Sequence, residues 1–268
     1  MLIAKSMDVV LDEAPVERVL PARPARRPFA WYAVLGVSVL AVVSGLLGML
    51  AFVIVALAYL PAHPGSPPSA QQNALNASNA ASALNQLTLA AGYLPIAFVL
   101  LFFLPRLAGA PLEALGFRRL RARDAMPIVV GFVILEIGSF AYERILVALH
   151  QGAHRQVGFE HMRFHGVADV VVTFAVGCVV APVAEEIFFR VFVLNAFAAW
   201  MPFGAAAAAS AGLFAWAHLD AVVAPEIFFL ALMFTALYRY THSIYASMIL
   251  HGVNNSIAFL LIGLQPHA

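Results

Sequence analysis

Long apolar stretches constrain the fold of this chain more than any other feature. A transmembrane helix needs about 20 mostly apolar residues. Stretches near or above that length span residues 31–60, 87–104, 125–149, 167–200, 203–219, 225–240 and 244–264. The sequence therefore predicts an all-α fold, a polytopic transmembrane helical bundle. It has seven spans, or eight if Pro182 breaks the stretch at 167–200.

The composition supports a membrane protein over a large soluble helical core. Of the 268 residues, 63% are hydrophobic and only 11% are charged, whereas soluble domains carry about 25% charged residues. The net charge of +1 predicts no nucleic-acid partner. The single cysteine, Cys178, excludes an intrachain disulfide and a cysteine-based metal cage.

The placement of basic residues predicts the orientation of the chain. Arginines cluster before the first apolar stretch and in segment 106–124, whereas the polar loop expected at 61–86 contains no lysine or arginine. Because basic loops stay on the cytoplasmic side, we expect an integral protein of the cell (plasma) membrane with a cytoplasmic N-terminus. Residues 1–30 are predicted to form a disordered cytoplasmic arm, and residues 31–166 the N-terminal transmembrane helices and their loops.

Three short polar motifs lie within the apolar stretches of the last hundred residues. They are Glu185-Glu186-x-x-x-Arg190, Phe214-x-x-x-His218 and His251-x-x-x-Asn255. Ionisable groups at membrane depth are expensive and usually mark a functional site. Carboxylates, imidazoles and an amide are the groups needed to activate water and to stabilise an oxyanion. The motifs therefore indicate a hydrolytic site built within a membrane.

The spacing within the first motif indicates different roles for the two glutamates. Neighbouring residues diverge by about 100° on a helix, so Glu185 and Glu186 need not share a role. Glu186 and Arg190 are spaced i, i+4, which suits an ion pair. This leaves Glu185 as the candidate base, with a charged cluster at a membrane interface as the structural alternative. A helix-to-helix contact is likewise the structural alternative for His251 and Asn255.

In their order and setting, the three motifs resemble the CPBP family. This family groups CAAX prenyl proteases of the Ras-converting type with bacteriocin-processing and immunity-linked membrane proteins. The resemblance covers about residues 167–264, which it identifies as a catalytic transmembrane core. It implies an intramembrane endopeptidase that hydrolyses a peptide bond near a membrane anchor. The implied partners are the lipid bilayer and a prenylated or otherwise membrane-anchored peptide or protein substrate.

The resemblance also implies roles for the motif residues. Glu185 corresponds to the essential glutamate that activates water, and His218 to the histidine that helps to hold that water. His251 and Asn255 correspond to the pair that polarises the scissile carbonyl and stabilises the oxyanion. The remaining motif residues, Glu186, Arg190 and Phe214, are expected to support the site.

Three alternatives stay open at this point. Glu185, His218 and His251 could supply three zinc ligands of a metalloendopeptidase, although we favour a site without a metal cofactor. The same scaffold could serve a non-catalytic membrane immunity or binding protein. The buried charges could also form the ion pathway of an ion-coupled transporter.

Overall fold

The protein is described by a computed structural model that covers residues 35–40, 43–44, 46–48, 50–51, 54, 79–150, 164 and 166–263. These residues are almost entirely helical and contain no strand, which confirms the all-α prediction. The predicted arm at 1–30 lies outside the described residues, as do most of the loop expected at 61–86 and most of the polar segment after residue 150. The cytoplasmic N-terminus therefore stays a prediction.

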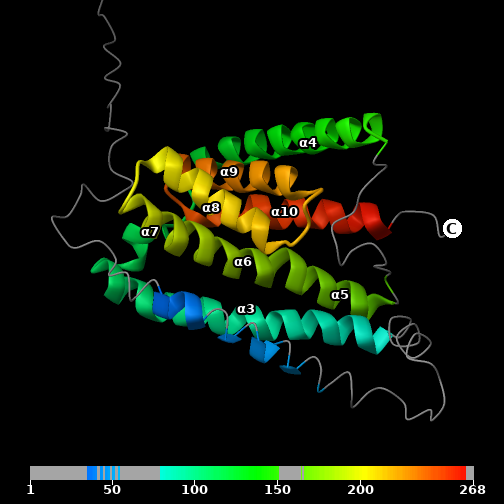
Figure 1. Ribbon diagram of the computed structural model, residues 1–268, viewed down its shortest axis with the longest axis horizontal. Helices are drawn as coiled ribbons and strands as arrows, with labels where there is room; N and C mark the ends of the chain where they lie inside the picture. The colour runs from blue at the N-terminus through cyan, green and yellow to red at the C-terminus, as the bar shows by residue number, and fades with distance from the viewer. Residues whose placement is uncertain are drawn as a thin grey trace, which may run out of the picture.

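The helices lie side by side in one bundle (Figure 1). Their bounds are α3 (Asn79–Ala108), α4 (Ala125–Ala148), α5 (Val167–Ala175), α6 (Ala181–Glu186), α7 (Leu194–Ala198), α8 (Phe203–Ala217), α9 (Ala224–Thr241) and α10 (Ile244–Gly263). α3 packs along α5 and α6 on one side of the bundle, and α4 packs against α9 on the other. α10 contacts both α6 and α9, so it lies where the two sides of the bundle meet.

Four helical segments are long and apolar enough to cross a membrane. They are Gln86–Arg106, Ala122–Ala148, Val167–Ala198 and Ile244–Leu261, while α8 is apolar but shorter. By length and composition, this part of the chain is that of an integral membrane protein. The predicted total of seven to eight spans is not confirmed by these residues.

Pro182 does not divide the helical segment Val167–Ala198. A proline lacks the N–H that would bond to a carbonyl one turn earlier. Here the wider π-helical segment η3 (Val176–Val180) comes directly before α6, and a second one, η4 (Ile187–Val193), directly follows it. The prediction of an eighth span from a break at Pro182 therefore fails. Single π turns are frequent at functional sites, and here they flank both glutamates.

α3 begins earlier than the sequence predicted. It starts at Asn79, inside the segment 61–86 that was expected to be a loop. Residues 79–86 include three alanines, and alanine has the highest helix propensity. These residues therefore extend the helix beyond its strongly apolar part. The helix also continues through Pro95 and Pro105.

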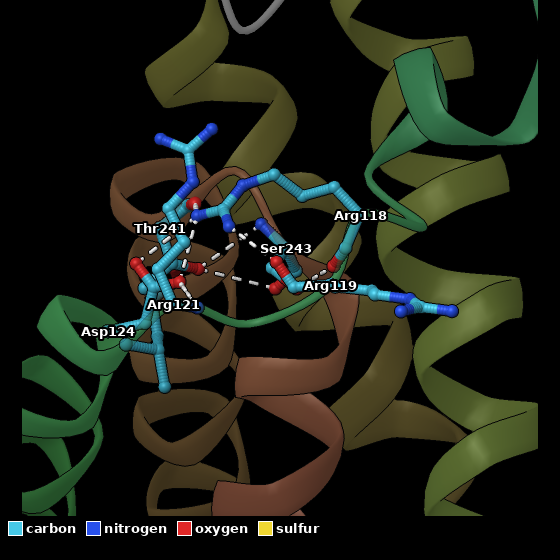
Figure 2. Close-up of polar contacts among 7 residues, drawn as sticks. Arg118, Arg119, Arg121, Asp124, Thr241 and Ser243 are labelled. Atoms are coloured by element: carbon cyan, nitrogen blue, oxygen red, sulfur yellow. Dashed lines mark hydrogen bonds and ion pairs between the residues drawn. The ribbon is translucent and has the colours of Figure 1, made fainter.

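A polar cluster fixes the start of α10, and Figure 2 shows its contacts. We call it the Arg118 clamp; it consists of Arg118, Asp124, Thr241 and Ser243. The Arg118 guanidinium lies 3.0 Å from Asp124 Oδ2 and donates to the Thr241 carbonyl oxygen. Ser243 Oγ donates to the Arg118 carbonyl oxygen at 2.8 Å. The clamp therefore ties the segment before α4 to the turn between α9 and α10.

Candidate active site

A buried ion pair joins Glu186 and Arg190. Arg190 Nη1 lies 3.0 Å from Glu186 Oε1, and the side chains are 1% and 0% exposed. This contact has the distance of an ion pair but not the angle of a hydrogen bond. The Arg190 guanidinium also lies over the ring of Phe214, 4.6 Å from its centroid, and donates to the Ala231 carbonyl oxygen at 3.3 Å. The pair thus anchors η4 against α8 and α9.

Glu185 is the more accessible of the two glutamates and has different partners. Its side chain is 13% exposed. Its Oε1 accepts a hydrogen bond of 2.7 Å from the Tyr93 hydroxyl of α3. Its Oε2 lies 3.7 Å from Nε2 of His251. One carboxylate oxygen is therefore held by a neutral donor while the other faces an imidazole.

The His251 ring lies between the two glutamates. Its Nδ1 is 3.1 Å from Glu186 Oε1, whereas its Nε2 faces Glu185. Because an ionised carboxylate can only accept a hydrogen bond, the contact with Glu186 places a proton on Nδ1. The ring is also stacked on Phe234, with 4.6 Å between the ring centroids. Glu186 and Phe234 together orient the histidine so that Nε2 is presented to Glu185.

The backbone around His251 packs unusually closely against η3. A Cβ atom added to Gly252 would lie 2.4 Å from the Cys178 carbonyl oxygen. One turn later, Asn255 Nδ2 donates to the Gly177 carbonyl oxygen at 2.9 Å. This carbonyl lies five residues before Pro182, in the place where a π-helical N–H would bond if the proline had one. The Asn255 amide therefore binds a carbonyl that Pro182 cannot satisfy.

His218 reaches the cluster through an aromatic ring. It follows the last residue of α8, and its Nδ1 donates to the Phe214 carbonyl oxygen at 2.7 Å. The Phe214 ring lies 4.7 Å from the His218 ring and 5.9 Å from the His251 ring, between centroids. Glu185 makes its described polar contacts with Tyr93 and His251 rather than with His218.

The structure thus brings five of the motif residues into one group of direct contacts, namely Glu185, Glu186, Arg190, Phe214 and His251. His218 adjoins this group through Phe214, and Asn255 lies one turn further along α10 with an amide N–H bound to η3. The chemical roles assigned to all seven residues stay predictions.

Two features of the site were missed from the sequence. The bond from Tyr93 was missed because Tyr93 lies in an apolar stretch without a motif; a hydroxyl in that stretch was the available signal. The contact between His251 and Glu186 was missed because spacing alone assigned Glu186 to Arg190.

The arrangement of the described residues gives no support to a zinc site at the three alternative ligands. No group of three or more His, Cys, Asp or Glu side chains in this part of the chain is placed to hold one. Of the three alternative zinc ligands, Glu185 and His251 face each other, whereas His218 adjoins His251 through the Phe214 ring. Independence from metal stays a prediction.

Comparison with known proteins matches this part of the chain to a family model. Residues 167–257 match the family model of the type II CAAX prenyl endopeptidase Rce1-like proteins. No curated protein and no solved structure gave a match. The matched segment contains all three motifs, and it confirms the resemblance drawn from them. Through residues 167–257, the chain is therefore similar to the CAAX prenyl endopeptidases that this model describes.

Proposed function

We propose that the protein is an intramembrane endopeptidase in which Glu185 activates the attacking water. The observation that carries this proposal is the arrangement of Glu185 and His251, whose facing atoms lie 3.7 Å apart within a segment matched to a protease family. That distance is too long for a direct hydrogen bond. A water molecule about 2.8 Å from each atom would bond to both.

The proposed chemistry follows from the protonation of His251. With its proton on Nδ1, the neutral ring offers the Nε2 lone pair. A water that donates one proton to Glu185 Oε2 and the other toward His251 Nε2 directs its own lone pair at a substrate carbonyl. Glu185 takes the proton as the water oxygen attacks, and the protonated carboxyl can return it to the leaving amine.

The other motif residues take supporting roles in this proposal. Asn255 has a second amide N–H beyond the one bound to Gly177, and this N–H would stabilise the oxyanion. His218 would hold the substrate or the water from the α8 side of Phe214. Glu186 and Arg190 hold His251 and the surrounding helices in place.

We propose a membrane-anchored peptide, including a prenylated one, as the substrate class. The family name specifies a CAAX prenyl endopeptidase, and the candidate site lies among helices apolar enough for a bilayer. A lipid anchor on the substrate would place its peptide bond at the membrane, which supplies much of the positioning that hydrolysis requires.

The test uses the full chain reconstituted in lipid vesicles. The probe is a fluorogenic peptide with a farnesylated C-terminal CAAX sequence, and a second peptide carries a palmitoyl anchor instead. We expect cleavage of at least one peptide, identified by mass spectrometry of the products, and its loss in Glu185→Ala. Failure to cleave either one, together with uptake of ions or solutes into the vesicles, would instead support a transporter.

A further inference from the structure

Tyr93 connects the candidate site to a helix outside the matched segment. It lies in α3, more than seventy positions before residue 167. Among the described residues, it packs against the largest buried core cluster, which also includes Leu100 and Leu104 of α3. Its hydroxyl donates to Glu185 Oε1 at 2.7 Å. The site described above is therefore completed by a residue from the N-terminal half of the chain.

We infer that Tyr93 is a positioning residue for Glu185, an inference that rests on the proposed function. The terminal torsion of a glutamate is broad, so its carboxylate needs a partner to fix its plane. A hydroxyl donor to a carboxylate forms a short bond of about twice the strength of a neutral hydrogen bond. The bond from Tyr93 has such a length, whereas the His251 contact of Glu185 is 3.7 Å long.

This bond determines which oxygen of Glu185 does the chemistry. With Oε1 occupied by the Tyr93 hydroxyl, Oε2 is the oxygen that faces His251 Nε2 and would take the proton from water. Without Tyr93, the carboxylate can rotate and present either oxygen in several orientations. We therefore expect the loss of Tyr93 to slow the chemical step more than it weakens substrate binding.

The first experiment compares Tyr93→Phe with wild type and with Tyr238→Phe in vesicles. Tyr238 is a matched control, because its hydroxyl also makes a buried hydrogen bond, to the Leu115 carbonyl oxygen at 2.9 Å. Tyr93→Phe should lower kcat by about 10- to 100-fold, as expected for loss of a hydrogen bond to a charged group. Its KM should stay within about twofold of wild type. Tyr238→Phe should leave both constants near those of wild type.

A second measurement tests the contact without using activity. Dicyclohexylcarbodiimide modifies carboxyl groups in membrane segments, and mass spectrometry gives the rate at which the peptide containing Glu185 is labelled. Because Tyr93 covers Oε1, labelling should be faster in Tyr93→Phe than in wild type and Tyr238→Phe. If wild type cleaves no peptide but this difference appears, the proposed function fails and the Tyr93 contact stands. Unchanged kcat in an active enzyme, or unchanged labelling in an inactive one, would overturn the inference.

Discussion

The clearest energetic prediction concerns Arg190, a fully buried cation. Replacing it with methionine keeps an unbranched side chain of similar length but removes the charge. The Glu186 carboxylate, which is 0% exposed, then loses the partner that lies 3.0 Å away. Glu186 then keeps one polar contact, from its Oε1 to Nδ1 of His251 at 3.1 Å.

The magnitude follows from the state of Glu186 after the change. Breaking a buried pair by removing one partner costs about 3–5 kcal/mol, because it leaves an uncompensated buried charge. Since His251 still faces Glu186, we expect a loss near the lower end, about 3 kcal/mol of unfolding free energy. Removing both charges in Glu186→Gln with Arg190→Met should cost about 1 kcal/mol or less, because no buried charge is then left alone.

The assay is reversible unfolding in mixed dodecylmaltoside and SDS micelles, followed by circular dichroism. Arg144→Met serves as the control, because Arg144 is an exposed arginine of α4, and its change should stay within about 0.5 kcal/mol. Glu185→Gln should lose only about 1 kcal/mol, since the amide oxygen can still accept from Tyr93. Equal losses in Glu185→Gln and Arg190→Met would refute the division of roles between the two glutamates.

Three further predictions concern the surroundings of the site. Gly252→Ala should lower the unfolding free energy by about 1–3 kcal/mol and reduce turnover, because its Cβ would meet the Cys178 carbonyl oxygen. The control is Gly212→Ala in α8, where an added Cβ meets open space. It should change the unfolding free energy by less than about 1 kcal/mol in the same denaturant titration. Asn255→Ala should reduce kcat about 100-fold in the vesicle assay while lowering stability by only about 0.6 kcal/mol, the average for a polar contact between membrane helices. Activity should persist after dialysis against EDTA and 1,10-phenanthroline, and the purified protein should contain no stoichiometric zinc by elemental analysis; activity that is lost on chelation and returns with zinc would contradict this.

The fold class could be predicted from the sequence, because the length and composition of the apolar stretches are enough to indicate membrane-spanning helices. The apolar stretches at 125–149 and 244–264 match α4 and α10 to within one residue at each end. The loop expected up to residue 86 was less well predicted, because Asn79 and the alanines that follow are polar or small but compatible with a helix.

The stretch around Pro182 shows where local rules are insufficient. Proline normally ends or kinks a helix, and this rule predicted a break or a kink at Pro182. The helix instead accommodates Pro182 through the π segment before it, and Asn255 of α10 binds the Gly177 carbonyl. That partner comes from a helix more than seventy residues later, so no sequence window around Pro182 contains it.

In the candidate site too, contacts within one helix were predictable from the sequence and contacts between helices were not. Pairing of Glu186 with Arg190 follows from i, i+4 spacing within one helix. The contact of Glu186 with His251 and that of Glu185 with Tyr93 join separate helices, so they depend on how those helices pack. Sequence spacing therefore predicted the pair within a helix but neither of the contacts that set the orientation of Glu185 and His251.

The role of Glu185 as the base is tested by the single-turnover cleavage rate of the anchored peptide by Glu185→Gln in vesicles. Glu143→Gln is the matched control, because Glu143 is an exposed glutamate of α4 outside the motif cluster. If Glu185 is the base, Glu185→Gln should cleave about 10²- to 10⁴-fold more slowly than wild type. Glu143→Gln should cleave at the wild-type rate. A Glu185→Gln variant that folds, binds the peptide and cleaves it as fast as wild type would show that Glu185 is not the base.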